Sequence, residues 1–161
     1  MEEQSKLTKL EALISTKGKL VRTVSHDLEA THSETNVLSA QVMVVDTGDS
    51  VDYFLLLSKE REDDEVVAAI AEDDFKAITG AIASLKAASL VDVYLNADHV
   101  QNIFATDDNF TIGYFVLDSS LTWFIALDED SDELEYFDDL SVIENLLTSA
   151  QEKIKEIKKV K

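Results

Sequence analysis

One pattern occurs twice in this chain, and it constrains the fold more than any other feature. In each copy, four strand-like segments precede a helix-like segment that opens on two aspartates. The helix-like segments align at an offset of 65 residues, where Asp73-Asp74-Phe75 matches Asp138-Asp139-Leu140. Upstream, Tyr53-Phe54-Leu55 stands opposite Trp123-Phe124-Ile125 at an offset of 70. The shared order of elements predicts an internal duplication, with connecting loops that differ in length.

The strand-like segments are recognised by apolar runs of strand length, several of which alternate, bounded by turn residues. In the first copy we expect strands at 20–28, 37–46, 51–58 and 66–71, with a hairpin turn at 46–50. In the second copy we expect them at 100–106, 110–117, 121–128 and 134–137, with a hairpin turn at 118–120. Consecutive strands joined by short turns favour antiparallel pairing.

Three segments have the periodicity of helices. A short N-terminal helix is indicated by Leu7, Leu10, Leu13 and Ile14, which share one face. The helix of the first copy is predicted to be capped by Asp73 or Asp74 and to bury Phe75, Ile78, Ile82 and Leu85. Gly80 lies inside it, which disfavours a helix unless packing compensates or a neighbour approaches closely. The last helix begins at Asp138-Asp139 and runs nearly to the C-terminus.

These elements predict an α+β fold: two antiparallel β-sheet units, each followed by a helix, with a short N-terminal helix. A length of 161 residues suits one compact domain. We therefore expect a single domain over 1–161 with internal halves at about 18–89 and 90–161.

The charge is strongly negative and unevenly distributed. The formal net charge is −19, yet residues 1–22 hold five bases and three acids, and residues 151–161 hold five lysines and two glutamates. The 128 residues between them hold 28 acids and four bases, a net of −24. Such a field repels phosphate backbones and anionic membrane surfaces. We expect no nucleic acid and no membrane as partner, and a charged partner should be basic.

The same acidity also has a plainer explanation. The chain has no proline and four glycines, so its turns rely on Asp, Asn and Ser, and acidic side chains favour solubility. There is no cysteine, which excludes disulfides, thiolate zinc sites and cysteine nucleophiles. The acidic N-terminus lacks the pattern of a signal peptide, and no run reaches the length of a membrane helix. We expect a cytoplasmic protein.

The hairpin segments 42–57 and 110–127, together with the two Asp-Asp helix starts, carry a resemblance. The twice-repeated order of four strands and a helix resembles an uncharacterised group of small bacterial proteins, which implies no activity. The topology is also similar to single-stranded nucleic-acid binders of the Whirly and PC4 type. Those proteins use basic sheet faces, and residues 23–150 here are acidic, so the resemblance implies fold and not function.

No catalytic motif is present. His26, His32 and His99 are the only histidines, and none has the neighbours that a nucleophilic or zinc site requires, so we interpret them as structural or surface residues. The isolated glycines exclude a phosphate-binding loop. With 33 acids, carboxylate pairs are uninformative, so a carboxylate enzyme stays open as an alternative. We expect no enzyme and no cofactor.

One acidic cluster has the spacing of a calcium loop. Asp128, Asp130, Asp132 and Asp139 imitate positions 1, 3, 5 and 12 of such a loop. Glu133 stands where the loop needs glycine, and Asp139 is shorter than the usual bidentate glutamate. We therefore expect no metal and interpret the cluster as an acidic hairpin tip.

The final helix is longer than its counterpart in the first copy. Its extra turns carry Ile154 and Ile157 on the apolar side and Lys155 and Lys158 among five lysines. We expect these four residues to contact a second subunit or a partner, the alternative being that the isoleucines cover the N-terminal helix of the same chain. The function we expect is a non-catalytic, acidic protein-interaction module that forms a homodimer. An acidic secretion-chaperone-like protein, a nucleic-acid mimic and an unrecognised carboxylate enzyme are the alternatives.

Overall fold

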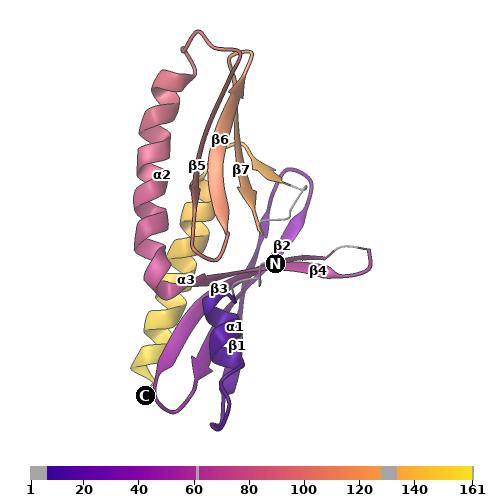
Figure 1. The fold of residues 1–161 in the computed structure, drawn as a ribbon. Coiled ribbons are helices and arrows are strands. Elements are labelled where there is room, and N and C mark those ends of the chain that lie inside the picture. Colours follow the sequence, from indigo (N-terminus) through magenta and orange to yellow (C-terminus); the bar gives the residue numbers. More distant parts are fainter. Residues whose placement is uncertain (1–6, 61, 128–133, 161) are drawn as a thin grey trace, which may run out of the picture.

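The computed structural model describes residues 7–60, 62–127 and 134–160 and has the predicted α+β fold (Figure 1). A short helix, α1 (Lys9–Ile14), precedes two four-stranded antiparallel sheets. Sheet A consists of β1 (Arg22–His32), β2 (Val37–Asp46), β3 (Val51–Glu60) and β4 (Glu65–Ala71), and is followed by α2 (Glu72–Asp92). Sheet B consists of β5 (His99–Ala105), β6 (Thr111–Leu117), β7 (Ser120–Ala126) and β8 (Glu135–Phe137), and is followed by α3 (Ser141–Lys159).

The two sheets are similar in strand order and in register. Both are meanders in which each strand pairs with the next in sequence. In sheet A Val44 pairs with Tyr53, and in sheet B Tyr114 pairs with Trp123. Both pairs differ by 70 residues, the offset seen in the sequence. The second hairpin therefore repeats the first residue for residue.

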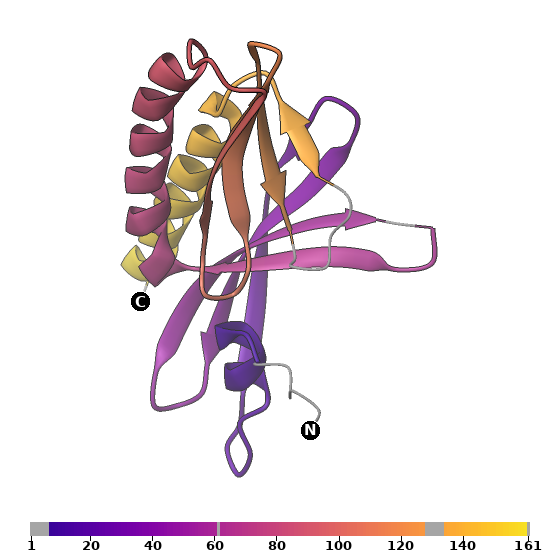
Figure 2. The same cartoon turned by 45° about the horizontal axis from the view of Figure 1, so that its top comes forward.

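A single apolar core joins the two halves. Alternate residues of both sheets point into it, together with the buried faces of α2 and α3. The helix α2 contacts β3 and β4 of sheet A and β5 and β6 of sheet B. The helix α3 packs against β1, β2 and β3, which belong to the other half of the chain. Figures 1 and 2 show the two helices next to each other on one side of the molecule, while the β3–β4 hairpin projects away from them.

The opposite face of sheet A is covered by α1. Its buried Leu10 and half-buried Leu13 belong to a second, smaller cluster. The sheet supplies the other buried members of this cluster, Val45, Phe54, Leu56 and Ala71. A capping box between Thr8 and Glu11 closes the first turn of α1. The structure therefore shows the N-terminal helix on the outer face of sheet A, remote from the main core.

Two details of the helices differ from the sequence-based expectation. Neither aspartate caps α2: Ala71 is its N-cap residue, no side chain caps it, and Asp73 and Asp74 lie in its first turn. There they favour the helix through its dipole, and Asp74 also binds Lys9 of α1. The helix α3 begins only at Ser141, whose backbone N–H donates to Asp139 at 2.8 Å. In neither helix does the Asp-Asp pair serve as the N-cap residue.

Candidate protein-interaction surface

The outer face of sheet B lies on the side away from the main core. The pairing register puts thirteen residues on it, which we call the sheet B face. They are His99, Gln101, Ile103 and Ala105 of β5, Thr111, Gly113, Phe115 and Leu117 of β6, Ser120, Thr122, Phe124 and Ala126 of β7, and Tyr136 of β8. None of these residues carries a charge at neutral pH when histidine is neutral, in a chain of which 29% is charged.

Aromatic rings form the centre of this face. The ring centroid of Phe115 lies 6.0 Å from that of Phe124, 6.2 Å from that of His99 and 6.4 Å from that of Tyr136. The contact with His99 is stacked and the contact with Tyr136 is edge-on, both within the usual range of aromatic pairs. The four rings thus form one connected group across the sheet, with Phe115 at its centre.

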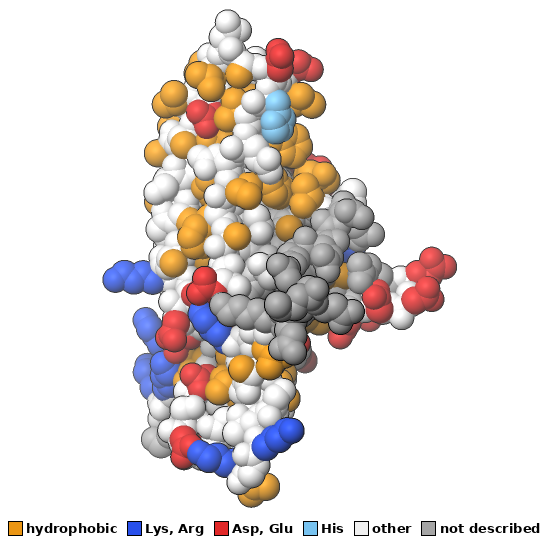
Figure 3. All heavy atoms as spheres, in the orientation of Figure 1, with side chains coloured by type: hydrophobic (Ala, Val, Ile, Leu, Met, Phe, Trp, Pro, Cys, Tyr) orange, Lys and Arg blue, Asp and Glu red, His pale blue; other side chains and the backbone are white. Residues whose placement is uncertain are grey.

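Aliphatic side chains around these rings are open to solvent. Ile103 is 51% exposed and Leu117 is 50% exposed. Figure 3 shows hydrophobic side chains gathered over the part of the molecule that sheet B occupies. Phe124 and Ala126 on the same face are buried, at 2% and 8% exposed, so the open apolar surface lies around them. Exposed apolar surface is typical of interaction sites in soluble proteins.

The same face of sheet A has equivalent residues, and there it is covered. The two registers match Met43, Val45, Phe54, Leu56 and Ala71 of sheet A, in order, with Gly113, Phe115, Phe124, Ala126 and Tyr136 of sheet B. The sheet A set packs under α1. Only residues 93–98 connect α2 to β5, and they form no helix. The two similar sheets therefore both have an apolar outer face, while the described residues hold one α1.

This face was not predicted from the sequence, although the sequence contains one signal of it. The matched triplets around Phe54 and Phe124 already identify two equivalent sheets. A single N-terminal helix cannot cover both of them. With α1 known to pack on one sheet, a comparison of the number of predicted helices with the number of sheets would have indicated that the outer face of the other sheet has no helix on it.

The structure places the four proposed interaction residues of α3 as follows. Ile154 is 1% exposed within the main core, and the partly buried Ile157 packs against the same core. Lys158 binds Glu72 at 3.1 Å and lies 4.8 Å from the ring centroid of Tyr53. Lys155 is exposed. The isoleucines thus pack on the inner face of sheet A. They do not pack on α1, and they do not form an open surface.

Three members of the calcium candidate, Asp128, Asp130 and Asp132, lie outside the described residues. The fourth, Asp139, is exposed and accepts hydrogen bonds from the backbone and hydroxyl of Ser141, which lower the pKa of its carboxyl. Within the described ranges no three acidic or histidine side chains come together in an arrangement that could hold a metal ion.

The three histidines are separated in the structure. His26 is half-buried on β1, beside Val24 and Ile157 in a hollow of about 190 Å³. His32 is exposed at the end of β1. His99 belongs to the sheet B face. His26 lies in the middle of β1, His32 at its end and His99 on β5, so each belongs to a separate local environment.

An open groove of about 470 Å³ lies between α1, β3 and the start of α2. Glu72 and Asp73 line it together with apolar residues such as Leu13 and Phe54. The nearby cations are engaged, since Lys9 binds Asp74 at 3.0 Å and Lys158 binds Glu72. The groove thus has two carboxylates next to apolar side chains and is open to solvent.

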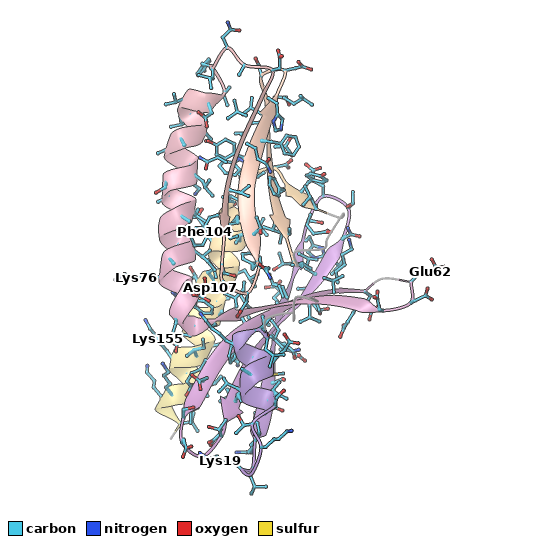
Figure 4. All side chains as sticks on the ribbon, in the orientation of Figure 1. Lys19, Glu62, Lys76, Phe104, Asp107 and Lys155 are labelled. Atoms are coloured by element: carbon cyan, nitrogen blue, oxygen red, sulfur yellow. The ribbon has the colours of Figure 1, made fainter. Side chains whose placement is uncertain are left out.

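Exposed acids gather at one hairpin tip. Figure 4 shows Glu62 at the tip of the projecting β3–β4 hairpin, and Lys76 and Lys155 on the side of the helices. Asp63, Asp64 and Glu65 share that tip and are exposed.

Among the residues described, no helix is long and apolar enough to span a bilayer. No family model matches this sequence, and comparisons with curated proteins and with solved structures found no similar protein.

Proposed function

We propose that this chain is a non-catalytic protein-interaction module whose docking surface is the sheet B face. The observation that carries the proposal is an uncharged sheet face with exposed apolar side chains, among them Ile103 at 51% and Leu117 at 50% exposed. Phe124 on the same face is 2% exposed, so the surface open to a partner is the β5 side of the face and the end of β6. Burying exposed apolar surface stabilises an association by roughly 25 cal/mol per Å².

The face suits a protein better than a nucleic acid. Stacking of bases on aromatic rings is effective where cations follow the phosphate backbone. The thirteen residues of the sheet B face include no lysine or arginine. The topology is similar to that of the Whirly and PC4 type, and we propose this similarity for the fold alone. The uncharged face supports a protein partner.

Self-association is part of the same proposal. The end of α2 and the residues after it expose Leu90, Val91, Tyr94 and Leu95. The one charged side chain among residues 87–97, Asp92, accepts a hydrogen bond from the hydroxyl of Tyr114. Two copies of a chain with net charge −19 meet with least repulsion where charges are few. A homodimer formed at this end of α2 leaves the sheet B face available.

A secretion-chaperone-like role is the second candidate, because an apolar face also suits an incompletely folded client. In this role the partner is incompletely folded, whereas the first candidate binds a folded protein. Both use the same surface. The nucleic-acid mimic and the carboxylate enzyme stay predictions, and for the enzyme the groove beside Glu72 and Asp73 is the place to test.

The experiment is site-specific photo-crosslinking in the native cell. A photoreactive amino acid replaces Leu117 on the sheet B face in one variant and the similarly exposed Val67 of β4 in a control variant. We expect a discrete protein adduct from position 117 and none from position 67. Equal labelling at both positions, or no protein adduct at 117, contradicts the proposal. Light scattering on Leu90→Asp tests the dimer separately.

A further inference from the structure

The free edge of β5 is suited to pairing with another chain. We propose that it pairs with β5 of a second copy, antiparallel about a two-fold axis at Asn102, so that two four-stranded B sheets form one continuous sheet. This inference rests on the self-association in the proposed function and adds the strand and the register through which it occurs. Its grounds are an unprotected strand edge, the side of α2 next to it and the scarcity of charge around both.

The other three edge strands have features that discourage pairing with another chain. The strand β1 carries Asp27 and Glu29 and has an irregular register between Leu28 and Thr31. The strand β4 follows the exposed acids of the hairpin tip, and β8 has only three residues. In contrast, β5 has seven residues, a regular register with β6 and no charged side chain when histidine is neutral. It is therefore the edge most open to an additional strand.

The backbone groups on the free edge of β5 follow from its hairpin with β6. The N–H of Thr106 donates to the carbonyl of Phe110 at 2.9 Å. Because hydrogen-bonded pairs alternate along an antiparallel ladder, Asn102 and the other even-numbered residues of β5 bond to β6. Gln101 and Ile103 then direct their N–H and C=O groups to the free edge. In the part of the chain that the structure describes, no other strand pairs with this edge.

A two-fold axis at Asn102 makes this edge complementary to itself. It sets Gln101 opposite Ile103 of the second copy, so the free backbone groups of each copy bind those of the other. It also sets Val100 opposite Phe104 of the second copy, and a β-branched residue opposite an aromatic ring is a favourable cross-strand pair. Val100 and Phe104 are only partly buried within one chain. The pairing therefore covers apolar surface that one chain leaves open.

Small residues line the side of α2 next to this edge. The helix packs on β5 (Figure 1). At spacings of three and four, one side of it holds Ala77, Ala81, Ser84 and Ala88. One turn further, Asp92 accepts a hydrogen bond from Tyr114, to which Asn102 of β5 donates at 3.3 Å. Another side carries Lys86, which binds Glu144 of α3. A second copy of α2 can therefore approach the small residues closely.

Charge is scarce across this region. Residues 77–106 hold three charged side chains, Lys86, Asp92 and Asp98, in a chain of which 29% is charged. Lys86 and Asp92 are bound within the chain. Two copies of net charge −19 therefore repel each other least when they meet here.

The β5 edge and α2 together have the area of a specific interface. Seven strand residues span about 23 Å, and a sheet with one helix layer is roughly 20 Å thick. The side of the molecule that they form covers roughly 450 Å² in projection on each copy. Specific interfaces begin at about 1,000 Å² in total, so a second copy of the chain fits this side.

A proline tests the edge without disturbing the β5–β6 hairpin. In Gln101→Pro the lost N–H faces the free edge, where a strand tolerates proline. Light scattering should show the full chain at twice its 17.9 kDa, and Gln101→Pro should raise the dissociation constant at least roughly tenfold. Gln101→Ala keeps the N–H and is the matched control, with an unchanged constant. Circular dichroism checks that both variants fold.

A single cysteine tests the register, because the chain has none of its own. On the two-fold axis, Asn102→Cys brings the two Cα atoms to about 4.5 Å, within reach of a disulfide. In Ile103→Cys they are about 8 Å apart, beyond that reach. Under mild oxidation we expect a covalent dimer from Asn102→Cys and none from Ile103→Cys.

Three results overturn the inference. The first is a full chain that is monomeric at millimolar concentration. The second is a dimer that Gln101→Pro leaves intact, and if Leu90→Asp dissociates that dimer, self-association occurs at the end of α2 instead. The third is equal disulfide formation at positions 102 and 103, which also decides the matter if Gln101→Pro does not fold. A protein adduct at position 117 of a monomeric chain leaves the docking surface intact and refutes only the pairing.

Discussion

Lys59 of sheet A binds Glu135 of sheet B, with 2.8 Å between Nζ and Oε2, and the pair links the two halves of the chain inside the molecule. The side chains are 13% and 2% exposed. The other carboxylate oxygen accepts hydrogen bonds from Asn36 at 2.8 Å and from Ser33 at 3.0 Å. Glu135 of sheet B stands where sheet A has Ile70, because each pairs with the equivalent residue of the neighbouring strand. At a position that is apolar core in sheet A, sheet B thus has a carboxylate that bridges the two sheets.

Removing this carboxylate should destabilise the protein. Glu135→Ala leaves the Lys59 ammonium and the donors of Ser33 and Asn36 without this acceptor, and we expect a loss of about 3 kcal/mol in the free energy of unfolding. Urea denaturation measures it. Glu65→Ala, an exposed acid at the start of β4, is the control and should change the value by less than about 0.5 kcal/mol. A loss as small as that of the control would show that the pair contributes nothing net.

Two glycines should respond in opposite ways to alanine. A Cβ at Gly80 of α2 would have no atom within 4 Å apart from the backbone of its own helix, so no neighbouring element approaches it. Gly80→Ala should stabilise the protein by about 0.5–1 kcal/mol. At Gly113 a Cβ would overlap the carbonyl oxygen of Asn102 and lie 2.8 Å from Cγ2 of Ile103, so Gly113→Ala should destabilise. Thermal unfolding of both variants distinguishes them, and a destabilised Gly80→Ala would indicate a neighbour from another chain.

The last turns of α3 should contribute to stability within one chain. Ile154 is buried against sheet A, so Ile154→Ala should lower the free energy of unfolding by about 2–5 kcal/mol. The loss should be the same at low and high protein concentration, because the contacts of Ile154 lie within one chain. The exposed Lys155→Ala is the control, with an expected change within about 0.5 kcal/mol. A loss that depends on protein concentration would indicate that Ile154 contacts a second subunit.

Tyr114 should make folding sensitive to alkali. Burial, and then its hydrogen bond to Asp92, raise the pKa of its hydroxyl. A raised pKa means that the folded state holds the proton more tightly. The resulting stability is present below the ordinary tyrosine pKa near 10 and is lost as the pH rises through the folded value.

Tyr114→Phe tests this directly. It should cost about 1 kcal/mol at neutral pH through the lost hydrogen bonds with Asp92 and Asn102. It should also reduce the difference in unfolding free energy between about pH 8 and about pH 11. Tyr94→Phe, at an exposed position, is the control. An unchanged alkaline loss in Tyr114→Phe would assign that loss to other groups.

The local elements were largely predictable from the sequence. The expected strand at 37–46 has the observed bounds, and the hairpin pairing of Val51 onward follows its alternation. These predictions succeed because strand period and turn residues act over a few neighbours. The helix starts were less accurate, since Asp73 and Asp74 suit both an N-cap and a first turn.

The packing of the elements could not be predicted in the same way. An apolar stripe shows that one side of α3 is buried, and it does not say against which sheet. Ile154 belongs to the second copy in sequence and packs on the sheet of the first. The sheet B face was missed for the same reason, because its exposure depends on where α1 lies. The side chain of Glu135 looked like one acid among 33 until its partner Lys59 was placed beside it.

The packing of α3 on sheet A has a consequence for how the chain is made. A ribosome adds about 5–20 residues per second, and Ser141–Lys159 are synthesised well after the last strand of sheet A. Sheet A is complete in sequence at Ala71, so its inner face waits several seconds for the helix that covers it. During that interval the nascent chain presents an open apolar sheet. Translation speed and chaperone capacity, as well as final stability, should therefore set the yield of native protein.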